Sequence, residues 1–108
     1  MDDGRRLAID IVVPLYNEEP VVAEFHRQLM AVVTGLRREC DVQTYYVNDG
    51  SVDHTGAELA RLAAGDPPVT ILELSQNFGH QGALTAGLDR AAGDVAVMLD
   101  GDGQHPPG

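Results

Sequence analysis

Residues 7–20 read LAIDIVVPLYNEEP and join an apolar run to the start of a helix. Residues 7–14 are almost all apolar and rich in β-branched side chains, which is typical of a parallel strand buried on both faces. Residues 17–20 then carry the signals of a helix start, with Asn17 as an N-cap candidate and Pro20 in the first turn. An apolar stripe follows at helical spacing and predicts the buried face of that helix. Its members are Val22, Phe25, Leu29, Val32, Val33 and Leu36.

The same alternation of strand and helix continues to the end of the chain. We expect further strands at 41–48, 69–74 and 94–99, and helices at about 54–64 and 82–93. Four strands that alternate with helices predict an α/β fold with a parallel, Rossmann-like sheet. We expect right-handed crossovers and, by analogy with doubly wound sheets, the strand order 3-2-1-4, with the reversal between the first and fourth strands. Ligands of such sheets bind at the carboxyl ends of the strands, next to that reversal.

Composition narrows the classes of function. The chain has 108 residues, 44% of them hydrophobic, and a formal net charge of −10. This charge disfavours nucleic acid as a partner. Cys40 is the single cysteine, so no disulfide framework is expected and a reducing, cytoplasmic setting is favoured. No apolar run is long enough to span a bilayer.

Oxygen-bearing side chains follow the last expected strand. Asp100 and Asp102 are two residues apart, and Gln104 continues the same spacing. Three hard oxygen donors suit Mg²⁺ or Mn²⁺, which could bridge the protein to a diphosphate that its net charge would otherwise repel. The alternative is a polar surface turn, in which Asp and Gly are common.

The loops after the first two expected strands also carry candidate side chains. Tyr16 offers a stacking face and Glu18 a hydrogen-bond acceptor, although both residues also fit a plain helix start. Asp49 either points outward to accept hydrogen bonds from a ligand or belongs to a turn. In that turn, Ser51 or Asp53 would cap the next helix. His26 lies on the first helix, and we expect its side chain to be solvated or half-buried.

Four segments in order resemble the family 2 glycosyltransferases of the GT-A fold, and most of all the dolichyl- or polyprenyl-phosphate sugar transferases. The segments are VVPLYNEE (12–19), VNDGSVDHT (47–55), LSQNFGHQGALTAGLDRAAGD (74–94) and MLDGDGQHPP (98–107). The resemblance implies that Asp100 and Asp102 form the family's Asp-x-Asp motif, which holds a metal on the nucleotide diphosphate, with Gln104 as a further ligand. It also implies that Pro14, Tyr16 and Glu18 surround the nucleoside and that Asp49 reads the base.

The resemblance departs from the family pattern at two positions. Gln76 stands where relatives commonly carry a basic residue, and Asn48 stands where many have the first of two aspartates. We also expect the acceptor-binding half and the catalytic base to lie outside residues 1–108. These residues would then be the nucleotide-sugar-binding part of the catalytic domain and would contain no catalytic residue of their own.

The function implied is metal-dependent, inverting transfer of a sugar from a nucleotide-diphosphate donor to an acceptor. A polyprenyl phosphate at the cytoplasmic face of the membrane, or a glycan, would be that acceptor. The alternative is a non-catalytic module that binds a nucleotide or a metal, or one half of an assembly. The strand at 94–99 would form an exposed apolar edge, for which we expect self-association or low stability.

Overall fold

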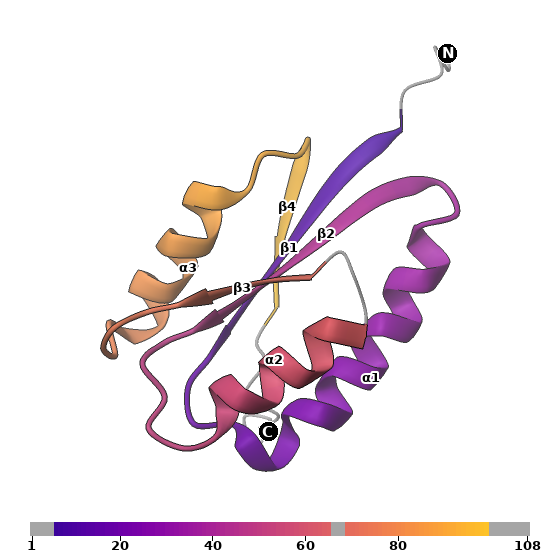
Figure 1. Ribbon diagram of the computed structural model, residues 1–108. Coiled ribbons are helices and arrows are strands. Elements are labelled where there is room, and N and C mark those ends of the chain that lie inside the picture. Colours follow the sequence, from indigo (N-terminus) through magenta and orange to yellow (C-terminus); the bar gives the residue numbers. More distant parts are fainter. Residues whose placement is uncertain (1–5, 66–68, 100–108) are drawn as a thin grey trace, which may run out of the picture.

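The computed structural model describes residues 6–65 and 69–99, and these form a four-stranded parallel sheet with helices on both faces (Figure 1). The strand order β3-β2-β1-β4 confirms the predicted fold and topology. Along the chain the elements are β1 (Leu7–Leu15), α1 (Glu19–Leu36), β2 (Cys40–Asn48), α2 (Thr55–Gly65), β3 (Val69–Glu73), α3 (Gly79–Arg90) and β4 (Val95–Met98).

The central strand β1 is buried on both faces, as its apolar run predicts. Ile11, Val13 and Leu15 face α1 and α2 and join the larger core cluster. Val12 faces the opposite way and packs with Val47 of β2 and Ala83 of α3. Figure 1 shows α1 and α2 together on one side of the sheet and α3 on the other. The sheet therefore has two cores, and β1 contributes to both.

Helix α1 buries a narrower stripe than the sequence predicts. Val22, Leu29 and Val33 are buried, but Val32 is 59% exposed. His26 lies at the centre of the stripe and is only 3% exposed, so the expectation of a solvated or half-buried side chain is wrong. Its Nδ1 lies 2.6 Å from the Tyr46 hydroxyl, and this hydrogen bond makes burial of the imidazole tolerable.

The buried residues of helix α3 are small, Ala83 and Gly87, and the helix packs closely on the sheet through them. A Cβ at Gly87 would lie 2.3 Å from Val12 Cγ1, so a larger residue needs a shift of the helix or of the buried Val12 side chain. The helix begins at Gly79 and ends at Arg90, three residues earlier at each end than the sequence predicts. This shift brings residues 79 and 80 to the edge of the sheet where the strands end.

Strand β4 is an open edge in the described part of the chain. It pairs with β1 alone, and Val95, Val97 and Met98 are 43%, 39% and 50% exposed. This agrees with the exposed apolar edge predicted from the sequence, while self-association stays a prediction. Within residues 6–65 and 69–99, no helix has the length and hydropathy needed to cross a membrane.

Candidate functional site

A pocket of about 240 Å³ lies at the carboxyl ends of the strands, and we call it the strand-end pocket. It contains all four described residues that the sequence predicts to contact a nucleoside: Pro14, Tyr16, Glu18 and Asp49. The loop between β3 and α3 completes the lining. The rest of the lining is Leu15, Asn77, Gly79 and His80. The topology thus brings three segments that are distant in sequence to one place.

Asn17 sets the direction of the loop that carries Tyr16 and Glu18. Its φ of 52° lies in the left-handed region, which asparagine tolerates better than most residues. Its Oδ1 accepts a hydrogen bond from Val52 N at 2.8 Å, and its own N–H donates to Ser51 Oγ at 2.9 Å. Asn17 therefore ties the end of β1 to the loop after β2.

Asn17 does not cap α1, so the N-cap role predicted from the sequence is wrong. Glu18 occupies the N-cap position of α1 and makes no capping hydrogen bond with its side chain. The Asn17 amide oxygen is already bonded to the neighbouring loop, so it does not serve the helix.

The start of α2 is stabilised by Asp53, one of the two cap candidates. Asp53 Oδ1 accepts hydrogen bonds from Thr55 N at 2.9 Å and from Thr55 Oγ1 at 2.6 Å. The same threonine hydroxyl accepts from Glu18 N at 2.9 Å, which joins the starts of α1 and α2. Partial burial raises the pKa of Asp53, but the hydrogen bonds from Thr55 and Glu19 outweigh it, so the net shift of the pKa is downward.

Asp49 lines the pocket with a carboxylate that is already bonded within the protein. The residue is 3% exposed, and its Oδ1 accepts a hydrogen bond from Phe78 N at 2.8 Å. The Asn77 amide donates to both Asp49 Oδ2 and the Asp49 carbonyl oxygen at 3.1 Å. The carboxylate therefore holds the β3–α3 loop in place and does not simply point outward. Contact with a base stays a prediction.

Gly50 allows that loop to approach. Its φ of 70° is in the left-handed region, and a Cβ there would lie 2.3 Å from the Gln76 carbonyl carbon and 2.4 Å from Asn77 N. Gly50, Asn77, Gly79 and His80 were not predicted from the sequence as site residues. The NFGHQG segment (residues 77–82) matches no phosphate-loop pattern. The glycine directly after Asp49 was the sequence feature that could have indicated the close approach of this loop.

The predicted metal ligands Asp100, Asp102 and Gln104 lie outside the described residues. Within the described ranges, no group of three or more His, Cys, Asp and Glu side chains is placed to hold a metal ion. Leu99, which directly precedes Asp100, donates from its N–H to the Val12 carbonyl at 3.0 Å and so extends the pairing of β4 with β1. Because β1 and β4 are parallel, β4 runs toward the edge that carries the strand-end pocket.

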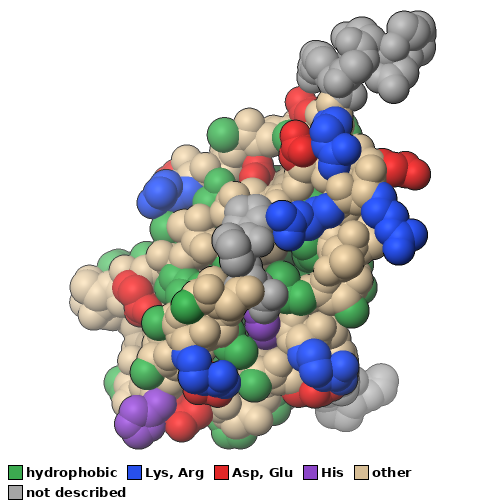
Figure 2. Space-filling model, turned by 45° about the vertical axis from the view of Figure 1, so that its right-hand side comes forward, with side chains coloured by type: hydrophobic (Ala, Val, Ile, Leu, Met, Phe, Trp, Pro, Cys, Tyr) green, Lys and Arg blue, Asp and Glu red, His purple; other side chains and the backbone are tan. Residues whose placement is uncertain are grey.

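A larger hollow of about 510 Å³ lies at the opposite edge of the sheet. Its lining includes Arg6, Asp10 and Asp41, and basic and acidic side chains gather at this end of the molecule in Figure 2. Arg6 donates to the Asp41 carboxylate at 2.8 Å and to the Cys40 carbonyl at 2.7 Å. None of the residues predicted to bind a ligand lines this hollow, so we assign the candidate site to the strand-end pocket.

A parallel sheet of order 3-2-1-4 with a pocket at its strand ends is the architecture of nucleotide-binding α/β domains. Residues 10–108 match the family model described as glycosyl transferase family 2, and the chain belongs to this family.

Curated relatives and solved structures agree with this assignment. The chain is 42% identical to an uncharacterized glycosyltransferase, YkcC, of Bacillus subtilis, over 96% of this chain and 32% of that protein. It is 37% identical to a bactoprenol glucosyl transferase of Shigella phage SfV, over 93% of this chain and 32% of that protein. The mannosyltransferase PcManGT of Pyrobaculum calidifontis, solved in complex with GDP-Man and Mn²⁺, superposes with a TM-score of 0.74 at 25% identity, over 92% of this chain and 28% of that one. The chain thus spans about a third of the length of these relatives.

Proposed function

We propose that the strand-end pocket binds the nucleoside of a nucleotide-diphosphate sugar, and that the protein passes this sugar to a polyprenyl phosphate. The observation that carries the proposal is the convergence of Pro14, Tyr16, Glu18 and Asp49 on one pocket at the strand ends. A relative that is named a bactoprenol glucosyl transferase supports a lipid-phosphate acceptor. A structural neighbour solved with GDP-Man and Mn²⁺ supports a nucleotide sugar and a divalent metal.

The side chains of the pocket suit the parts of a nucleoside. Tyr16 is 44% exposed, so its ring is available to stack on a base. Glu18 can accept hydrogen bonds from ribose hydroxyl groups. Each carboxylate oxygen of Asp49 keeps further acceptor capacity beside the bonds that it makes to the β3–α3 loop. We therefore assign stacking to Tyr16 and recognition of the base edge to Asp49.

The diphosphate needs positive charge that the pocket supplies poorly. The chain has a net charge of −10, and residue 76 in the β3–α3 loop is the neutral Gln76, where the resemblance implies a basic residue. We assign a bound Mg²⁺ or Mn²⁺ to Asp100, Asp102 and Gln104, where it would neutralise the nucleoside diphosphate as it leaves. An acceptor phosphate oxygen would attack the anomeric carbon from the face opposite to the breaking bond, which inverts the configuration. Such an acceptor is already anionic and needs little help from a base.

Calorimetry with UDP and GDP tests the metal. We expect either nucleotide to bind more tightly with Mn²⁺ or Mg²⁺ than with EDTA, because the cation bridges the carboxylates and the diphosphate. Asp102→Ala should remove this difference, and Asp66→Ala, at a position to which the proposal assigns no ligand, should keep it. Equal affinity in Mn²⁺ and EDTA for the wild-type protein would overturn the metal bridge.

The pocket itself is tested with Tyr16→Ala. Loss of base stacking should weaken nucleotide binding about tenfold or more, with metal and with EDTA alike. Val52→Ala is a suitable control, because Val52 is 84% exposed and does not line the pocket. Unchanged affinity in the Tyr16 variant would place the nucleoside elsewhere. Transfer from the sugar donor to polyprenyl phosphate is measured with a chain that includes the expected acceptor-binding half. Nucleotide binding without transfer in that chain would favour the alternative, a non-catalytic module.

A further inference from the structure

We propose that the hydrogen bond from the Asn48 amide to the Glu73 carboxylate positions the strand-end pocket. Residue 48 must then be a neutral hydrogen-bond donor in this chain. The inference rests on the proposed function of the pocket. It concerns two residues outside the pocket lining, which act through the loop that carries Tyr16 and Glu18.

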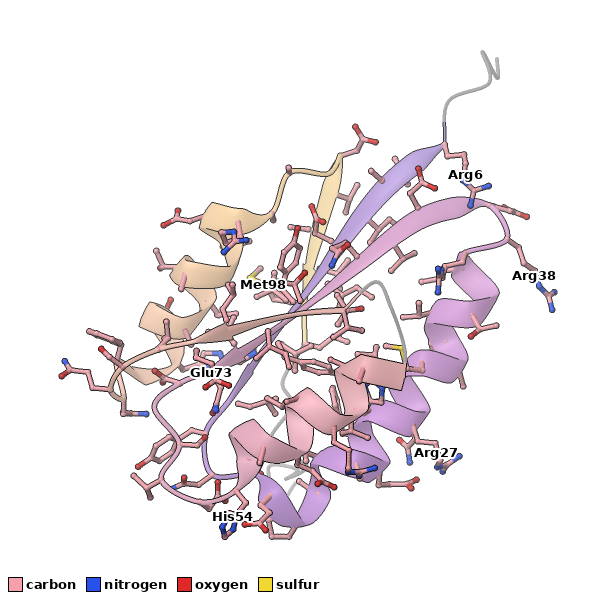
Figure 3. All side chains as sticks on the ribbon, viewed as in Figure 1. Arg6, Arg27, Arg38, His54, Glu73 and Met98 are labelled. Carbon is pink, nitrogen blue, oxygen red and sulfur yellow. The ribbon has the colours of Figure 1, made fainter. Side chains whose placement is uncertain are left out.

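The pair connects two strand ends. Asn48 is the last residue of β2 and is 4% exposed, and its Nδ2 donates to Glu73 Oε1 at 2.8 Å. Glu73 is the last residue of β3, and Figure 3 shows it on the side of the sheet where α2 begins. A Cβ at Gly56 in the first turn of α2 would lie 2.9 Å from Asn48 Nδ2 and 3.3 Å from Glu73 Oε2. The helix therefore packs tightly against both partners.

From Asn48 the hydrogen bonds continue to the pocket. The Ser51 hydroxyl donates to Asn48 Oδ1 and accepts from Asn17 N. Asn17 lies between Tyr16 and Glu18, the two residues of this loop that flank it in the pocket lining. The series Glu73–Asn48–Ser51–Asn17 thus links the ends of β3, β2 and β1, and it fixes the wall of the pocket.

The donor and acceptor directions in this series are determined by chemistry. An ionised carboxylate only accepts, so in the contact between the exposed Glu73 and the buried residue 48 the donor must be residue 48. The Asn48 amide meets this need with its nitrogen and keeps its oxygen for the serine hydroxyl. An aspartate at position 48 would still accept from Ser51, but its second oxygen would face Glu73 at hydrogen-bond distance. Two carboxylates so close do not both ionise at low cost, and one of them takes up a proton with a raised pKa.

The pair gives a physical reason for an amide at position 48, because Glu73 of the neighbouring strand already places a carboxylate there. A change at position 48 should therefore be compensated by a change at position 73, although the two residues are 25 positions apart.

The test uses four forms of the purified protein: wild type, Asn48→Asp, the double variant N48D/E73Q and the control N48D/E24Q. Glu24 lies on the exposed side of α1 and bonds to Arg27 and Gln28 of the same helix, so the control removes one negative charge and leaves the bond between residues 48 and 73 unchanged. Each form is measured for thermal unfolding and for the affinity of UDP and GDP in Mn²⁺, at several pH values between about 7.5 and 5, the range in which a paired carboxyl is expected to titrate.

At pH 7.5 we expect Asn48→Asp to lower the melting temperature by about 5 °C or more and to weaken nucleotide binding about tenfold. The ratio of its affinity to that of the wild type should return toward one as the pH falls, because a protonated carboxyl donates to its partner again. N48D/E73Q should recover both properties at pH 7.5, since the amide introduced at position 73 can donate to the carboxylate introduced at position 48.

Two results would overturn the proposal. One is an Asn48→Asp variant that matches the wild type in melting and affinity at pH 7.5. The other is a double variant N48D/E73Q no better than N48D/E24Q, which would mean that the added charge acts directly on the ligand. If the wild type binds neither nucleotide, the proposed function fails, but the melting data still decide whether Asn48 and Glu73 are coupled.

Discussion

Replacement of Gly50 by alanine should damage both the stability of the protein and the strand-end pocket. The glycine has a φ of 70°, and its missing Cβ would lie 2.3 Å from a backbone carbon of Gln76 and 2.4 Å from Asn77 N. Backbone atoms cannot rotate aside as a flexible side chain does. Alanine therefore forces the β3–α3 loop away from β2, or distorts the turn that follows Asp49.

The cost has two parts. A residue with a side chain in the left-handed region costs about 1–2 kcal/mol. Displacement of the loop also weakens the hydrogen bonds from Phe78 N and the Asn77 amide to the Asp49 carboxylate, and bonds to charged groups contribute about 1.5–3 kcal/mol each. We expect a loss of about 3–5 kcal/mol, which is a large part of the roughly 5–15 kcal/mol that stabilises a typical domain.

Gly35→Ala is a matched control. A Cβ at Gly35 would have no atom within 4 Å, and the residue lies within α1. The same chemical change should therefore stabilise the protein there by about 0.5–1 kcal/mol, because alanine favours the helix. Urea unfolding of both variants gives the two free energies, and calorimetry gives their nucleotide affinity. If Gly50→Ala unfolds and binds nucleotide like the control, the close approach of the two loops is not what builds the pocket.

Two further predictions concern the first turn of α2 and the edge of the sheet. Asp53→Ala should cost about 1 kcal/mol in urea unfolding at pH 7, because it removes the acceptor of the hydrogen bonds from Thr55. The pKa of Asp53 is lowered in the folded protein, so its stabilising effect is present above the pKa of the unfolded chain and is lost as the pH falls through the folded pKa. A cost that stays constant into that acid range would contradict the capping role. At the edge, Val97→Lys should reduce self-association in sedimentation experiments, since Val97 on β4 is 39% exposed. A wild-type protein that stays monomeric over a wide concentration range, with a constant melting temperature, would contradict the open-edge prediction.

The fold was predictable because its signals are local and repeat along the chain. The β-branched run at 7–14 indicated a strand buried on both faces, and the handedness of crossovers then limited the strand order to few possibilities. The boundaries of α3 were less predictable. Its small residues carry little periodicity, and its position depends on the contact between Gly87 and Val12, a contact between distant parts of the sequence.

Burial of polar residues was the weakest part of the sequence prediction. A pattern of apolar residues assigns positions to the core by residue type, so it placed Val32 in the core and left His26 outside. In the structure, the position of a residue around the helix axis decides whether its side chain is buried. The His26 imidazole can be buried because Tyr46, 20 residues away in the sequence, supplies a hydrogen-bond partner. No local pattern contains that information.

The sequence indicated which residues lie at the candidate site, but it did not indicate the hydrogen bonds that hold them there. Parallel strands end at one edge of a sheet, so Tyr16 and Asp49 could be expected near one another. Their polar neighbours could each be read as a cap or as a ligand-binding group. The structure shows that Asn17 and Asp49 bond to neighbouring loops and that Asp53 caps its own helix, with partners 35, 29 and 2 residues away in the respective bonds.

This arrangement has a consequence for experiments on the site. A single substitution of Asn17, Asn48 or Asp49 removes a link between loops as well as any contact with a ligand, so a loss of binding alone does not assign a role. Paired substitutions separate the two effects, because a structural link has two ends and either end can be changed to restore it. Asn48 and Glu73 are suited to this approach, since neither lines the pocket and both ends of their link are known. A contact between protein and nucleotide has only one end in the protein, and no second substitution in the chain should restore it.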